Sequence, residues 1–181
     1  ETKLLDDRDN DFDNVQAVEE ATVLSNDICI QEPPEQQCHV DLSQDYQQRI
    51  INQDGSINST DIGVLLSSSN YEELLNDFAL KKSSAFAFER EQEFQDKINT
   101  LTNEMEGIAR SQIGCSEHIC AIKIDTTIDT AFKTFSKQFF NSYKGHLFIK
   151  EQVENDQGFE SRVMFFPSSN GAIIQPIPHN K

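Results

Sequence analysis

The sequence ICAIKIDTTIDTAFKTFSKQFFNSYKG, residues 119–145, decides the class of fold, because a strand pattern gives way to a helix pattern within it. Residues 119–124 form a short run of mostly apolar residues, which we read as a strand. One face of this strand carries Cys120, Ile122 and Ile124. After Thr126-Thr127, which we expect to cap a helix, apolar residues recur at helical spacing. The apolar face of this helix carries Ile128, Ala131, Phe132, Phe135 and Phe139. Lys144-Gly145 is typical of a helix C-terminus.

Two further strands follow the helix, and the residues between them indicate a hairpin. Residues 146–154 and 159–166 both read as strands. Asn155-Asp156-Gln157-Gly158 joins them, and a glycine at the end of such a loop is typical of hairpin connections. We expect the chain from Pro167 onward to be a loop-like tail.

The strongest helical pattern precedes the first strand and runs over residues 71–109. Its second half carries one continuous apolar stripe, at steps of four, three, four and three residues. The stripe consists of Phe94, Ile98, Leu101, Met105 and Ile108. We expect this helix to end around Gly107 and Ser111-Gln112, and two short helices, at 45–51 and 59–66, to precede it.

The order of these elements predicts an α+β fold. Long amphipathic helices should pack on one face of a small sheet of about three strands, antiparallel or mixed. We expect three regions along the chain. Residues 1–44 form an acidic N-terminal arm with a loop closed by Cys29 and Cys38, residues 45–166 form the α+β domain, and residues 167–181 form the C-terminal tail.

The charge of the chain is concentrated at its N-terminus. The net charge is −16, and residues 1–45 hold thirteen acidic residues against two basic ones. Such a surface repels nucleic acids and anionic membranes, so we expect neither as a partner. No apolar run approaches the roughly 20 residues that span a bilayer. We expect Glu1 to be the start of a mature or trimmed chain, for which a tether through the N-terminus remains open.

Four cysteines form two close pairs in the sequence, Cys29 with Cys38 and Cys115 with Cys120. Three connectivities are possible, and pairing within each close pair is the simplest. Each short loop would contribute roughly 2–3 kcal/mol of stability. An even number of locally paired cysteines favours an oxidising compartment, the alternative being four free thiols in a cytosolic protein.

One part of the chain resembles a known type of domain. Phe88-Glu89 through Phe94, followed by Cys115-Ser116-Glu117-His118-Ile119-Cys120-Ala121-Ile122, is similar to a domain of uncharacterised bacterial envelope proteins, periplasmic or lipoprotein-like. In that domain an acidic amphipathic helix precedes a C-x4-C pair that leads into a strand, a helix and a hairpin. The resemblance covers about residues 70–166. It implies export and a disulfide, and it implies no activity.

The pair Cys115 and Cys120 also suggests two chemical alternatives. A redox dithiol is usually Cys-x-x-Cys at a helix N-terminus, whereas this pair leads into a strand, so a structural disulfide bracing a helix-to-strand turn is favoured. A zinc site could use Cys115, His118 and Cys120, but the remaining cysteines lie far away in the sequence.

A second candidate lies between the two short helices. Asn52, Asp54 and Asp61 fall on ligand positions of an EF-hand-like calcium loop centred on Gly55, but Ile50 occupies the first ligand position. A plain connection between helices is favoured. We find no nucleophile motif and no phosphate-binding loop, so the sequence predicts no catalytic residue and no cofactor.

These observations predict a non-enzymatic binding or assembly module of the bacterial cell envelope, periplasmic or extracellular. An unknown protein partner would dock on the helix faces or the sheet edge. Two alternatives remain open. One is a thiol-redox or metal-dependent protein using Cys115, His118 and Cys120, and the other is a calcium-stabilised adhesion or scaffold component using Asn52, Asp54 and Asp61.

Overall fold

The computed structural model describes residues 15–17, 28–32, 37–52, 54–141, 143, 145–155 and 158–167. Of the acidic arm predicted at residues 1–44, the structure describes residues 15–17, 28–32 and 37–44. The tail predicted at 167–181 lies outside the described residues, apart from Pro167.

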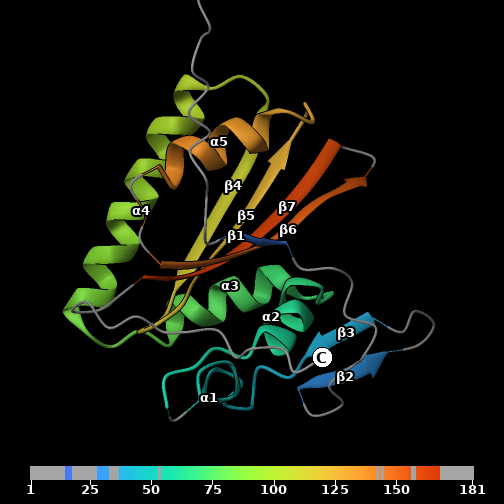
Figure 1. Cartoon of the computed structure of the whole chain (residues 1–181), viewed down its shortest axis with the longest axis vertical. Coiled ribbons are helices and arrows are strands. Elements are labelled where there is room, and N and C mark those ends of the chain that lie inside the picture. The colour runs from blue at the N-terminus through green and yellow to red at the C-terminus, as the bar shows by residue number, and fades with distance from the viewer. Residues whose placement is uncertain are drawn as a thin grey trace, which may run out of the picture.

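A mixed sheet forms the centre of the molecule, with the strand order β1-β6-β7-β5-β4 (Figure 1). Its strands are β1 (Val15–Ala17), β4 (Ile108–Cys115), β5 (Cys120–Thr126), β6 (Gly145–Asn155) and β7 (Gly158–Pro167). β1 runs parallel to β6, and all other neighbours are antiparallel. The predicted α+β class is confirmed, as are the strand after Cys120 and the C-terminal hairpin. The sheet has five strands instead of about three, because β1 and β4 join it.

The β6–β7 hairpin turns where the sequence indicates. Two features of the structure require a glycine at position 158. Gly158 has φ +134°, which L side chains rarely adopt. A Cβ at this position would also lie 2.2 Å from the carbonyl oxygen of Thr126 on the neighbouring strand β5. The glycine therefore lets β7 start directly beside the end of β5.

Helices α4 (Ala85–Glu104) and α5 (Ala131–Phe139) cover one face of the sheet (Figure 1). The parts of the predicted apolar stripes that lie within these helices point inward, and the aromatic rings of α5 meet those of β7. The predicted start of α5 is wrong: the helix begins at Ala131 after Thr130, so Thr126-Thr127 does not cap it and Ile128 is exposed. Phe165 is the centre of this layer, with edge-on or near-edge-on ring contacts at centroid distances of 5.1–6.2 Å. The surrounding rings are Phe94, Phe139, Phe140 and Tyr143. Such pairs add stability beyond the area they bury.

The opposite face is also covered, which differs from the one-sided arrangement expected. Helices α1 (Gln47–Ile50), α2 (Ser59–Leu66) and α3 (Tyr71–Leu80) form a second apolar core there, together with a two-stranded sheet of β2 (Cys29–Glu32) and β3 (Gln37–Val40). The sheet contributes Ala121, Phe148, Met164 and Phe166 to this core. The sheet is therefore buried on both faces.

The single helix predicted over 71–109 is wrong, and its break explains the second covered face. α3 ends at Leu80 and α4 starts at Ala85, because the side chain of Ser84 accepts a hydrogen bond from the Ala87 amide and caps a new helix. α3 passes so close to β4 that a Cβ on Gly114 would lie 1.9 Å from the Leu75 carbonyl oxygen.

The N-terminal disulfide closes the β2–β3 hairpin and is confirmed, with Cys29 and Cys38 Cα atoms 5.0 Å apart. Asn70, at the start of α3, docks this hairpin by bonding both the amide and the carbonyl of Val40, at 2.9 and 3.0 Å. Ile28, Cys38 and Val40 lie in the same core as α2 and α3. The described part of the predicted arm thus packs onto the α+β domain, while the boundaries at 44 and 166 remain predictions.

Candidate functional site

The Cys115–Cys120 disulfide sits at the tip of the β4–β5 hairpin. The two residues are direct cross-strand partners, with Cα atoms 4.1 Å apart, and both are fully buried. The predicted local pairing is confirmed, but the disulfide braces a strand-to-strand turn, because β4 occupies the place where the end of the helix was expected. The Ser116 amide donates to the Ile119 carbonyl at 2.8 Å and closes the turn.

The redox and zinc alternatives depend on these same sulfurs. In the disulfide neither Cys115 nor Cys120 is a thiolate, so both functions would require the bond to open. His118 is exposed in the turn between them. Among the described residues, no group of three or more His, Cys, Asp or Glu side chains could hold a metal ion.

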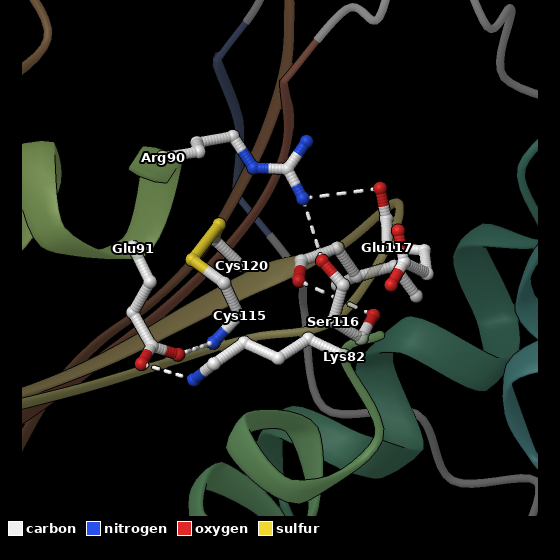
Figure 2. Close-up of a disulfide and its surroundings, with 8 residues drawn as sticks. Lys82, Arg90, Glu91, Cys115, Ser116, Glu117 and Cys120 are labelled. Carbon is white, nitrogen blue, oxygen red and sulfur yellow. Dashed lines mark hydrogen bonds and ion pairs between the residues drawn. A yellow bond between two sulfur atoms is a disulfide. The ribbon is translucent and has the colours of Figure 1, made fainter. Parts of the chain in front are cut away.

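Two side chains from the first turns of α4 hold this hairpin tip, one on each side of the disulfide (Figure 2). On one side, Arg90 Nη2 donates to the carbonyls of Ser116, at 2.5 Å, and Glu117, at 3.0 Å. On the other side, Glu91 accepts the Cys115 amide at 2.8 Å and pairs with Lys82. We call these contacts the hairpin latch. They fix α4 against main-chain atoms of the turn.

Arg90 is an unusual residue for this position, because it is only 5% exposed. Burial lowers the pKa of its guanidinium, which nevertheless stays a cation at neutral pH. Within the described part of the chain, its Nε and Nη1 atoms have no hydrogen-bond partner, although the ring of Phe86 lies 5.1 Å from its Cζ atom. Sequence reasoning missed this residue. The available signal was its position on the inward face of the helix, three residues after Ala87 and four before Phe94.

Glu117, in the hairpin turn, forms a further contact with the start of α4. Its carboxylate accepts hydrogen bonds from the amides of Ser83 and Ser84 and, at 2.6 Å, from the Ser84 hydroxyl. These bonds lower the pKa of Glu117 to about 2, with the Ser84 side chain as the largest cause. The negative charge also lies at the N-terminus of α4, where the helix dipole favours it.

A hollow with an acidic lining runs along α4 next to the latch and shares Glu91 with it. It is shallow, with a volume of about 720 Å³. We call its lining the α4 surface, which consists of Phe88, Glu89, Glu91, Gln92, Glu93, Gln95 and Asp96. Glu89, Glu93 and Asp96 are exposed, and none of them has an ion pair among the described residues. The surface thus carries three uncompensated negative charges beside an aromatic ring.

Exposed apolar side chains gather around the α3–α4 junction. Leu80 is 83% exposed, Phe86 51% and Phe88 53%. These are three of the five exposed large apolar residues in the described part of the chain, and they fall within nine positions. Of these three residues, Phe88 belongs to the α4 surface.

The loop proposed for calcium is closed by its own hydrogen bonds. Asp54 accepts the amide and the hydroxyl of Ser56, and Asn52 Nδ2 donates to the Ser56 hydroxyl at 2.8 Å. Asp61 lies in the first turn of α2, where its carboxylate accepts from the capping residue Asn58 at 2.8 Å. The three predicted donors therefore take part in turn and cap contacts.

A cluster of charged side chains lies on the sheet face that carries α3. Lys123 contacts Glu72 at 2.7 Å, Glu160 at 3.1 Å and Asp125 at 3.7 Å, and Arg162 contacts Glu160 at 2.5 Å. Burial lowers the pKa of Lys123, but the hydrogen bonds that its ammonium donates to Glu72 and Glu160 outweigh burial, and the pKa is raised. The cluster joins α3 to β5 and β7. With Arg110, which contacts Glu72 at 3.5 Å, it pairs three cations with three carboxylates.

Comparison with known proteins gives no relative for this chain. No protein-family model, no curated protein and no solved structure matches it. In the part of the chain that the structure describes, no helix combines the length and the apolar character needed to cross a bilayer. Two disulfides, with no free cysteine among these residues, fit a protein of a non-cytoplasmic, oxidising compartment.

Proposed function

We propose that this chain is a non-enzymatic binding module of the bacterial cell envelope, periplasmic or extracellular, and that a partner protein docks on the α4 surface. The observation that carries the proposal is the position of Phe88. This half-exposed aromatic ring lies in an acidic hollow, on a helix that is fixed to a disulfide-closed hairpin. Exposed aromatic residues on rigid elements are typical anchors of protein interfaces.

The hairpin latch supports this role because it orders the binding surface in advance. Arg90 and Glu91 hold the first turns of α4 to main-chain atoms of the hairpin, and the disulfide holds the hairpin closed. A partner that docks on an ordered surface loses less conformational entropy than one that must order a loop. The envelope location is supported by the two disulfides and by the resemblance to envelope domains.

Site-specific photo-crosslinking in cells that naturally make the protein tests this proposal. A photoreactive residue replaces Gln92, in the α4 surface, or Gln138, which is exposed on α5. We expect a discrete adduct with one envelope protein from position 92, its loss when Phe88→Ser is added, and no adduct from position 138. Equal adducts from both positions, or none from position 92, would refute docking on this surface.

A further inference from the structure

We infer that the partner contacts the α4 surface through a basic helix, with Lys or Arg side chains on successive turns. This inference rests on the proposed function, since it names the chemistry of the partner for that surface. It follows from the charge, the spacing and the aromatic ring of the hollow.

The negative charge of the hollow favours a cationic partner. Lys82 compensates Glu91, whereas Glu89, Glu93 and Asp96 face solvent without an ion pair among the described residues. The protein as a whole carries a net charge of −16, so its long-range field attracts basic partners and repels acidic ones. A second copy of this chain would bring the same carboxylates against one another, and like charges placed together oppose association.

The spacing of the three carboxylates selects a helix. Glu89, Glu93 and Asp96 follow one another at steps of four and three residues, so they form one stripe on α4. The rise along this stripe is about 6 Å and then about 4.5 Å. A partner helix lying along α4 would place basic side chains at the same steps opposite each carboxylate.

The ring of Phe88, next to this stripe, can hold a cationic side chain. The ammonium group of Lys82 lies 5.0 Å from the Phe88 ring centroid, so this ring already interacts with a cation from its own chain. Half of the side chain remains exposed. A basic helix could cover this remaining surface with the aliphatic stem of a Lys or Arg, whose charged end would reach the carboxylates.

The test uses the full chain and three alanine-rich peptides of about 20 residues, a length at which helices form in water. The first peptide carries Arg at steps of four and three. The second has the same composition with Arg at steps of two, and the third has Glu in place of Arg. Binding is measured by fluorescence anisotropy at low salt and located by amide chemical shifts.

We expect the first peptide to bind best, to shift the amides of residues 88–96, and to weaken as salt is raised. Glu89→Gln with Glu93→Gln should weaken it roughly five- to tenfold, and Phe88→Ser about tenfold. Glu104→Gln with Glu106→Gln is the matched control, because both residues are exposed and the net charge changes equally. That control should change the affinity less than twofold.

The outcomes separate this inference from the proposed function. Equal binding of the first two peptides, equal losses in both double variants, or amide shifts confined to other surfaces would overturn the basic helix. If the crosslinked partner contacts position 92 through an acidic or uncharged segment, the docking surface stands and the inference fails. If position 92 gives no adduct, the proposed function fails even where the peptide binds.

Discussion

Removal of the Cys115–Cys120 disulfide tests whether the hairpin tip supports α4. The cysteines are separated by 5 positions, and the chain-entropy relation gives about 2.1 kcal/mol for a loop of this length. Replacing both residues by alanine also removes two fully buried sulfur atoms, which adds roughly 1–2 kcal/mol. We therefore expect Cys115→Ala with Cys120→Ala to lower the free energy of unfolding by roughly 3–4 kcal/mol, measured by urea denaturation without reductant.

The latch predicts where this destabilisation appears first. Because Glu91 accepts the Cys115 amide and Arg90 donates to the Ser116 carbonyl, a looser turn should loosen the start of α4. Amide hydrogen exchange should become faster at Ala87–Glu91. The matched control removes the other disulfide, for which the same relation gives about 2.6 kcal/mol over 9 positions. It should leave α4 unchanged. A loss below about 1 kcal/mol, or unchanged exchange in α4 of the first variant, would contradict the reasoning.

Three further predictions concern single residues. Glu117 has a folded-state pKa lowered to about 2, so the stability it contributes is present above its unfolded pKa and is lost as pH falls from about 5 toward 2. The difference in urea midpoint between wild type and Glu117→Gln should therefore shrink over this pH range. A difference that stays constant would argue against this role of Glu117. Lys123→Met removes one of the two cations that pair with each of Glu72 and Glu160, and it should cost roughly 1–3 kcal/mol. The loss should be smaller if Glu160→Gln is added, and equal losses in the single and the double variant would show that the ion pairs are unimportant. Gly114→Ala should cost more than about 3 kcal/mol or prevent folding, since its Cβ would overlap α3. Gly55→Ala, with φ +83° but open space around it, should cost only about 1 kcal/mol. Thermal melts that rank the two variants in reverse would contradict the packing argument.

The sequence predicts those elements best whose pattern is local. The apolar faces of β5 and α5 repeat at one period each, and the β6–β7 hairpin carries its own turn signal, so all three could be placed from the residues alone. The two disulfides could also be paired, because each joins neighbours in the chain. The bounds of α5 were predicted less well, because the helix covers only Ala131–Phe139, inside the start and end signals read at Thr126-Thr127 and Lys144-Gly145.

Elements that depend on distant contacts could not be placed in this way. β4 is an edge strand with Ala109 and Arg110 exposed, so it lacks the alternation that marks a half-buried strand. The break between α3 and α4 depends on Ser84 as a cap and on Glu117 in the turn of the β4–β5 hairpin. Helical spacing continues through that break, and so the pattern alone predicted one long helix.

The candidate site was only partly predictable for the same reason. The resemblance included Phe88-Glu89 through Phe94 among the residues that carry it, but it did not indicate that this segment faces outward. The latch joins side chains of α4 to carbonyl and amide groups of a turn more than twenty residues away. Main-chain partners leave no trace in the sequence, because any residue in the turn supplies them.

The two covered faces of the sheet have a consequence for how the protein unfolds. Successive residues of β5 and β7 alternate between the two cores, with Ala121 in one and Ile122 in the other, and Met164 in one and Phe165 in the other. Each of these strands thus contributes side chains to both cores. Melting of either helical layer would leave a bare apolar face on the strands that support the other, so we expect both layers to be lost in one cooperative transition. We therefore expect that neither helical layer, taken with the sheet, would fold as an independent domain in another protein.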